Sequence, residues 1–137
     1  NALDLKMEAK RTAQMAGALK EQGANLYKAP GSPSVGAADA NVTVVEFFDY
    51  NCGFCRRAMP DVAKLTTEDP KVKIVFKEFP IFGADSEAAA KVAIASAKQG
   101  KYWEVHKGLF AHEGKLNEET ALGVAQGVLS APLFLHR

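Results

Sequence analysis

The chain has 137 residues, which suffices for a single domain with one modest hydrophobic core. Hydrophobic residues make up 47% of it and charged residues 24%, as in ordinary globular proteins. The formal net charge of +1 gives no electrostatic reason to expect binding to nucleic acid or to an anionic membrane, and no apolar run approaches the roughly 20 residues that cross a bilayer.

Residues 1–28 are predicted to be helical, because they contain few helix breakers. Small and aliphatic residues recur there at helical spacing, at Leu5, Ala9, Thr12, Ala16, Leu19, Gly23 and Leu26. Two interpretations stay open: the helix packs on its own domain, or it is an oligomerisation segment. Residues 29–40, APGSPSVGAADA, are predicted to be a linker or extended arm, so that the main domain spans residues 41–137.

Two strands and a helix are expected next. The run VTVVEFFDY, starting at Val42, is typical of a strand covered on both faces. A helix follows over about residues 51–67. The next strand is predicted in KVKIVFKEFPI, with Val75 and the lysines on its outer face. Its inner face is expected to carry Val72, Ile74 and Phe76.

Three further helices complete the pattern. An Asp85–Ser86 cap is expected to begin the first, a second carries Trp103 and the apolar-face His106, and a third starts after an Asn117 cap. We interpret His106 as a packed core histidine. The last residues, VLSAPLFLHR, contain a strand candidate. The order of elements indicates an α/β fold with a C-x-x-C motif at a strand-to-helix junction.

Cys52 and Cys55 are the only cysteines. A disulfide between such near neighbours closes a tiny loop, so stapling the fold is a poor reason for the pair to exist. The first helical turn presents unpaired N–H groups, which favour a thiolate. Cys52 is therefore predicted to be the nucleophile and Cys55 the resolving thiol. Arg56 has two open interpretations, a cation that supports the thiolate or a solvated helix residue, and Arg57 is interpreted as solvated.

Metal binding is the alternative chemistry for this pair. Zinc needs two more ligands, and His106 and His112 lie on another predicted helix without ligand-like spacing. We predict no metal and no cofactor. Binding of Cu(I) by the reduced cysteines stays open as an alternative.

The stretch VTVVEFFDYNCGFCRRAMP resembles the active-site strand and helix of the thioredoxin superfamily, in particular the DsbA-like bacterial oxidoreductases. The resemblance runs to about Gln126 and is similar to the branch with Com1-like and ScsC-like proteins. It rests on the C-x-x-C motif, on Glu46 six residues before Cys52, on Pro60, and on the helix that carries Trp103. It implies a thioredoxin-like fold with helices inserted at about residues 84–127.

The resemblance implies that Cys52, Cys55 and Glu46 are the catalytic residues, with Glu46 as the buried acid that eases proton transfer at the resolving thiol. A carboxyl group inside an apolar strand should also have a raised pKa. A structural salt bridge from Glu46 to Lys73 or Lys77 is an equally open interpretation.

The resemblance also implies substrate contacts from Gly53, Phe54 and Pro132. Strongly oxidising DsbA proteins have a His where Phe54 stands, so a less oxidising pair is expected here. Pro132 fits the family's cis-proline, although the residues alone favour a trans bond. The resemblance would lead one to expect a last strand and helix after this point. Two interpretations stay open: a shortened chain whose tail matches the motif, or a tail of unrelated sequence.

These observations predict a protein disulfide oxidoreductase or isomerase. Its expected partners are cysteine-containing protein substrates, a redox partner protein and further copies bound through residues 1–28, with no nucleic acid. The expected location is the bacterial periplasm, with the leader absent from this chain. The alternative is a Cu(I)-binding or inactive thioredoxin-like module.

Overall fold

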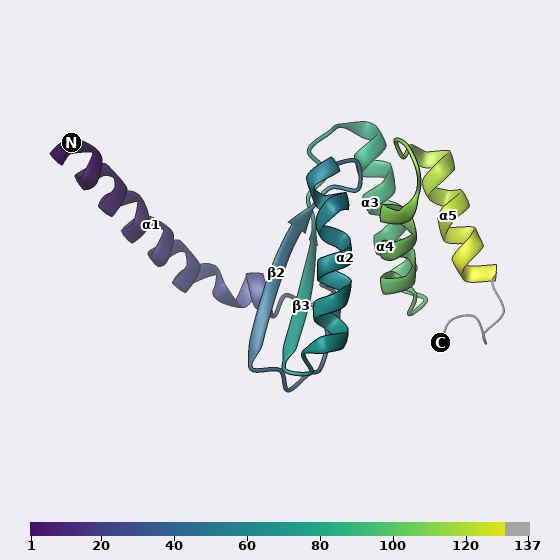
Figure 1. The fold of residues 1–137 in the computed structure, drawn as a ribbon, viewed down its shortest axis with the longest axis horizontal. Helices are drawn as coiled ribbons and strands as arrows, with labels where there is room; N and C mark the ends of the chain where they lie inside the picture. Colours follow the sequence, from purple (N-terminus) through teal and green to yellow (C-terminus); the bar gives the residue numbers. More distant parts are fainter. Residues whose placement is uncertain (131–137) are drawn as a thin grey trace. The chain divides into compact units, whose positions relative to one another are not determined.

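The computed structural model describes residues 1–130 and has two compact units, which divide after Ser32. The first unit holds the predicted helix, α1 (Ala2–Tyr27) (Figure 1). The side chain of Asn1 caps it by accepting hydrogen bonds from the N–H groups of Leu3 and Asp4, at 2.9 and 3.0 Å. No residue of α1 is buried, so this helix lacks the packed face that stabilises most helices.

The second unit is built on a three-stranded sheet of β1 (Ser34–Gly36), β2 (Val42–Phe48) and β3 (Val72–Glu78), in the order β1-β3-β2. Strand β2 runs parallel to β3, whereas β1 is antiparallel to β3. Strand β1 lies in the segment for which the sequence predicts a linker or arm. Gly36 is essential to this pairing, because a Cβ atom there would lie 2.4 Å from the carbonyl oxygen of Val72.

The two longer strands differ from the sequence prediction in burial. Val42 and Phe47 of β2 are each more than half exposed, so this strand is not covered on both faces within residues 1–130. Strand β2 is an edge strand there, with β3 on one side only. Val75, predicted to face outward, is 2% exposed because β3 is the central strand, with Ser34 and Val45 beside it in register.

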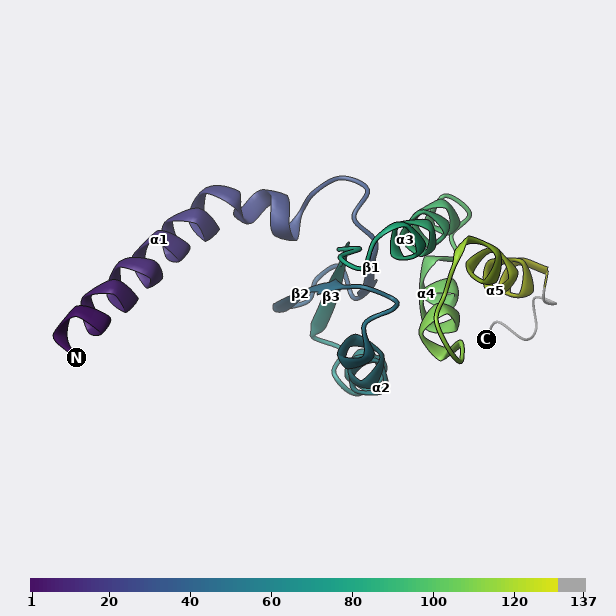
Figure 2. The same cartoon turned by 90° about the horizontal axis from the view of Figure 1, so that it is seen from above.

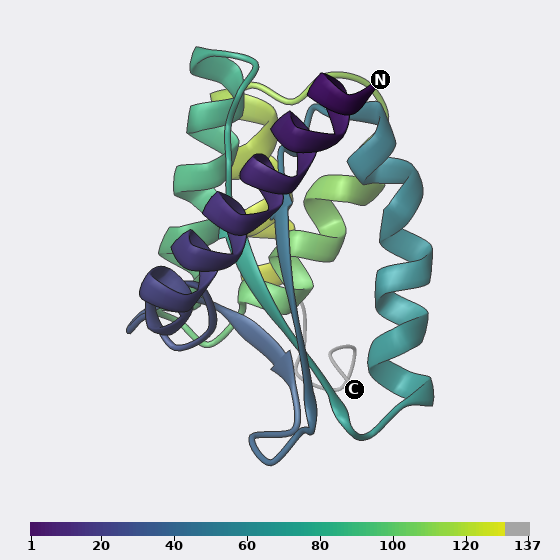
Figure 3. The same cartoon turned by 90° about the vertical axis from the view of Figure 1, so that its left-hand side faces the viewer.

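The helices of this unit are α2 (Gly53–Glu68), α3 (Ala84–Ala97), α4 (Tyr102–Ala111) and α5 (Glu118–Ser130). Helices α2 and α3 lie on opposite sides of β2 and β3 (Figures 2 and 3). The Asn117 cap of α5 is confirmed, since its side-chain oxygen accepts from the Thr120 N–H at 2.9 Å. The predicted cap of α3 is wrong: Gly83 is the N-cap, and Ser86 is a buried residue inside the helix whose hydroxyl donates to Asp49.

The core is an aromatic cluster between the sheet, α2 and α4. The ring of His106 lies 4.8 Å from that of Phe48 and 4.5 Å from that of Phe76, measured between centroids. His106 is fully buried, which confirms its interpretation as a core histidine. The predicted last strand and Pro132 fall outside the described residues.

Candidate active site

The two cysteines lie together where β2 ends and α2 begins. Cys52 is the N-cap residue of α2 and Cys55 belongs to its first turn. Both are half-buried free thiols. The N–H of Cys52 donates to the carbonyl oxygen of Asp49 at 3.0 Å, and its own carbonyl accepts from the N–H of Arg56 at 3.0 Å. The backbone therefore holds Cys52 at the helix start, as the C-x-x-C spacing predicts.

The environments of the two thiols push their pKa values in opposite directions. The N–H group of Cys55, followed by its thiol, lowers the pKa of Cys52 below its ordinary value. Burial raises the pKa of Cys55, and the nearby Cys52 and Glu46 raise it further. Cys52 therefore ionises first, which is the asymmetry that a nucleophile and a resolving thiol require.

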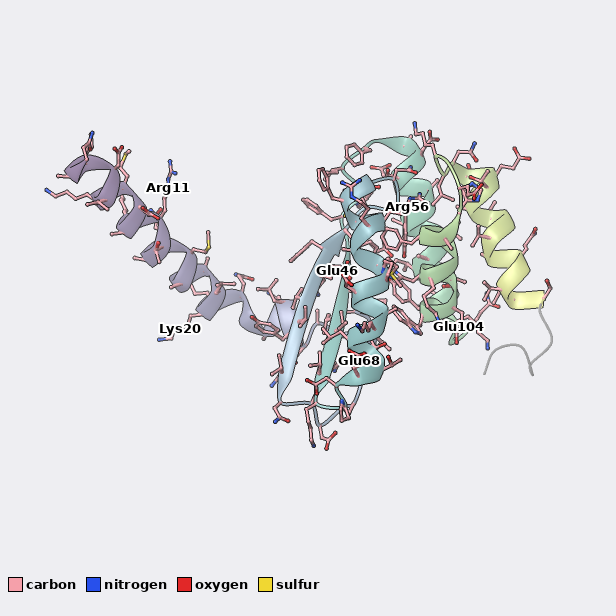
Figure 4. All side chains as sticks on the ribbon, viewed as in Figure 1. Arg11, Lys20, Glu46, Arg56, Glu68 and Glu104 are labelled. Carbon is pink, nitrogen blue, oxygen red and sulfur yellow. The ribbon has the colours of Figure 1, made fainter. Side chains whose placement is uncertain are left out.

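Glu46 lies on β2, beside α2 (Figure 4). Burial raises its pKa, and its Oε2 atom is buried without a hydrogen-bond partner. Glu46 is in register with Phe76, whereas Lys73 and Lys77 are in register with Thr43 and Phe47. Because side chains alternate along a strand, both lysines point to the other face of the sheet. The register thus gives no support to the salt bridge.

Two polar side chains anchor the cysteine loop to the segment between α4 and α5. The side chain of Asn51 accepts from the N–H of Leu116 at 2.8 Å and donates to its carbonyl oxygen at 3.1 Å. Arg56 lies at the start of α2 (Figure 4), and its guanidinium donates to backbone carbonyl groups. Its acceptors are the carbonyl oxygens of Tyr50, Phe110, His112 and Gly114. Arg56 is therefore a structural anchor, a third role beside the two that the sequence left open.

Asp49 anchors the same loop from the other side, and sequence reasoning missed it. Its Oδ1 atom accepts from the Asn51 N–H at 2.7 Å and from the Ser86 hydroxyl at 2.8 Å. Its Oδ2 atom accepts from the N–H groups of Ile81 and Phe82 at 2.9 and 3.1 Å. These four donors offset the free-energy cost of burying a carboxylate that is only 3% exposed. An FFDY segment before C-x-x-C offers no local sign of these distant donors.

A second buried polar cluster, also missed from the sequence, joins Tyr50 and β3 to α4. The hydroxyl groups of Tyr50 and Tyr102 donate to Oε1 of Glu78 at 3.0 and 2.9 Å, and the Tyr50 oxygen lies 2.8 Å from Nδ1 of His106. Burial raises the pKa of Glu78 to about 8 and lowers that of His106 to about 3. Glu78 thus holds a proton at neutral pH.

The surface beside Cys52 is open and partly apolar. Phe54 is 78% exposed, and the guanidinium carbon of Arg57 lies 4.5 Å from the centre of its ring. Gly53 lines an open pocket of about 810 Å³ together with Phe82 and residues 110–115. Gly53 and Phe54 thus lie at the surface between the two cysteines, where Gly53 lines the pocket and Phe54 is exposed. Pro132, the third predicted substrate contact, is outside the described residues.

Two further properties concern only residues 1–130. No group of three or more His, Cys, Asp or Glu side chains in this part of the chain is arranged to hold a metal ion. None of its helices combines the length and hydrophobicity that crossing a bilayer requires.

The fold and the cysteine junction can be compared with known proteins. A family model described as Thioredoxin matches residues 28–131. The chain belongs to this thioredoxin family. The predicted thioredoxin-like α/β fold is thereby confirmed.

Similar structures support the DsbA-like and ScsC-like resemblance. A thioredoxin-like oxidoreductase from Silicibacter pomeroyi is 46% identical, with a TM-score of 0.74 over 77% of this chain and 61% of that one. The catalytic domain of Proteus mirabilis ScsC is 28% identical, with a TM-score of 0.79 over 83% of this chain and 66% of that one. Both identities are 28% or higher, and both similarities cover more than three quarters of this chain.

Curated relatives carry two kinds of name. A probable disulfide bond formation protein D of Bacillus anthracis is 32% identical over 106 residues, which are 73% of this chain and 49% of that protein. A Na⁺/H⁺ antiporter NhaA 1 of Salinispora arenicola is 37% identical over 93 residues, which are 66% of this chain and only 14% of that protein. The chain therefore spans half or less of the length of these curated relatives.

Proposed function

We propose that this protein is a thiol-disulfide oxidoreductase that exchanges its Cys52–Cys55 disulfide with cysteine-containing proteins. The observation that carries the proposal is the opposite shift of the two thiol pKa values at the start of α2. The family and the oxidoreductase name of a 46% identical structure support it.

The proposed reaction begins with the oxidised pair. A substrate thiolate attacks Sγ of Cys52, the bond between the two cysteines breaks, and Cys55 leaves as a thiolate that takes up a proton. A second substrate thiolate then attacks the substrate sulfur of the mixed disulfide and releases Cys52 as a thiolate. The substrate gains one disulfide, and the protein gains the two electrons. The same steps in reverse reduce a substrate.

Glu46 is the proton donor to Cys55 in this scheme. Its pKa is raised by burial, so it carries a proton closer to neutral pH than an exposed carboxyl group does. Its buried Oε2 atom has no hydrogen-bond partner, and its charge affects the pKa of Cys55. A carboxyl group in this position is suited to hand a proton to the thiolate that leaves.

Trapping of mixed disulfides tests the two cysteine roles. Cys55→Ser should accumulate mixed disulfides with substrate proteins, because the resolving thiol is gone, and Cys52→Ser should accumulate far fewer. Non-reducing gels measure both, and equal trapping would contradict the assignment. If the reduced protein instead binds Cu(I) and fails to reduce insulin, the metal-binding alternative replaces the oxidoreductase.

Disulfide isomerisation in an oxidising compartment, the bacterial periplasm, is the form of this activity that we favour. Stable protein disulfides require such a compartment. The side chain of Phe54 adds no charge near Cys52, so the reduced form gains no extra stabilisation from this side chain and the pair should be less oxidising. An isomerase also benefits from several active sites around one misfolded substrate, which an oligomer provides.

Association through residues 1–28 is part of this proposal. Helix α1 buries none of its residues, and Leu5 and Leu19 of its stripe are 68% and 48% exposed. A second copy of the same helix would cover this stripe. Leu19→Glu, or removal of residues 1–28, should therefore lower the molar mass measured by light scattering. Gln14→Glu, which adds the same charge off the stripe, is the control, and monomers in every case would exclude this interface.

A further inference from the structure

Arg57 lies against both residues that separate the cysteines. Its guanidinium carbon is 4.5 Å from the centre of the Phe54 ring, within the range of a cation–π contact. Its Nη1 atom is 3.8 Å from the point that a Cβ atom on Gly53 would occupy. An exposed Arg side chain normally samples many rotamers, but here the contact with the Phe54 ring keeps the charge beside the dipeptide that separates Cys52 from Cys55.

The charge of Arg57 is not compensated within residues 1–130. The ion pairs of this part of the chain involve other cations, such as Lys64 with Glu68 on the same helix and Lys115 with Asp85. The carboxylate of Asp49 is buried and accepts hydrogen bonds from four other donors. A substrate carboxylate that arrives at Cys52 would thus meet an unpaired cation.

The lowered pKa of Cys52 has causes other than Arg57. The groups that lower the pKa of Cys52 are the N–H groups of Cys55 and Phe54 and the thiol of Cys55. Arg56, the other cation of this helical turn, is directed at backbone carbonyl groups. The positive charge that faces an approaching polypeptide is therefore that of Arg57.

We propose that Arg57 is a specificity-determining residue, which favours substrates with Asp or Glu beside the reacting cysteine and disfavours those with Lys or Arg. This inference rests on the proposed exchange function. Phe54 positions the guanidinium, and its apolar face limits the solvation of the cation on one side. The preference should weaken at high salt, because exposed charges are screened within about 3 Å at 1 M ionic strength.

The rates at which short peptides reduce the oxidised protein test this proposal. Three peptides with one cysteine each differ only in the adjacent residues, which are Asp, Ser or Lys. The ratio of the Asp rate to the Lys rate should be roughly fivefold lower in Arg57→Gln than in the unchanged protein at low salt. Comparing ratios between variants removes the intrinsic effect of peptide charge on thiol reactivity.

Two further variants sharpen the experiment. Arg57→Lys keeps the charge and should retain most of the preference, and Lys64→Gln removes a cation two turns farther along α2 and should leave it unchanged. An Asp-to-Lys ratio that is the same in Arg57→Gln and the unchanged protein would overturn the proposal for Arg57 alone. If no peptide reacts with the unchanged protein, the exchange function fails and the specificity proposal falls with it.

Discussion

The acidic residues around the cysteines form two contrasting groups. Asp49, between β2 and α2, is saturated: each of its two oxygen atoms accepts hydrogen bonds from two donors. Glu46 on β2 and Glu78 on β3 each keep one buried oxygen without a hydrogen-bond partner, and burial raises the pKa of both. The saturated carboxylate fixes the shape of the loop, whereas burial raises the pKa of the two unsaturated carboxyl groups, and Glu78 holds a proton at neutral pH. The contrast shows how similar side chains can serve structure or proton chemistry.

The largest expected effect on stability comes from replacing the saturated carboxylate of Asp49. Asp49→Asn places an NH₂ group where one carboxylate oxygen was, and either orientation of the amide points it at two existing donors. We expect a loss of about 3 to 4 kcal/mol in the free energy of unfolding, measured by denaturant titration. Asp61→Asn, at an exposed position on α2, is the control. A loss no larger than that of the control would show that the four donors are not held as described.

A pH-dependent gain in stability is expected from Glu78→Gln. The pKa of Glu78 is about 8 in the folded protein, against 4.5 for an ordinary glutamate, so the folded state binds the extra proton between these values. Stability therefore falls as pH rises from about 4.5 to about 8, and the loss persists above that. Gln imitates the protonated carboxyl group and should remove this loss.

The difference between Glu78→Gln and the unchanged protein should be small at pH 4.5 and reach about 2 to 3 kcal/mol above pH 8. Thermal and denaturant unfolding at several pH values measure it. Glu87→Gln, exposed on α3, is the matched control. A constant difference across this pH range would mean that Glu78 is ionised throughout, contrary to its buried position.

A smaller effect, on rate, is expected from Glu46→Gln. If the protonated Glu46 donates to Cys55, the variant should open its disulfide roughly tenfold more slowly near neutral pH, and the pH profile of this step should lose one inflection. Single-turnover reduction by a peptide thiol measures both quantities. Glu68→Gln, at the far end of α2, is the control. An unchanged rate and profile would place Glu46 with Asp49, as a structural group.

The sequence predicted the junction of β2 and α2 well, because the residue patterns that indicate a strand and a helix start are local. A β-branched and aromatic run followed by Cys52 and an apolar helical pattern places a thiol at a helix start without further information. The short strand β1 escaped prediction because three residues have no periodicity, and only pairing with β3 makes them a strand. The outer face of β3 was misjudged at Val75 for a similar reason, since β1 and β2 flank it on both sides.

The sequence by itself determined that two cysteines one turn apart begin a helix after a strand, because helix starts and strand patterns depend on neighbouring residues. Only the tertiary structure decided which acids are saturated by hydrogen-bond donors and which have a raised pKa. The donors to Asp49 come from residues up to 37 positions away, and Glu78 of β3 accepts a hydrogen bond from Tyr102 of α4. Hydrogen bonding and desolvation depend on such distant neighbours, and these two effects set the pKa of a buried carboxyl group.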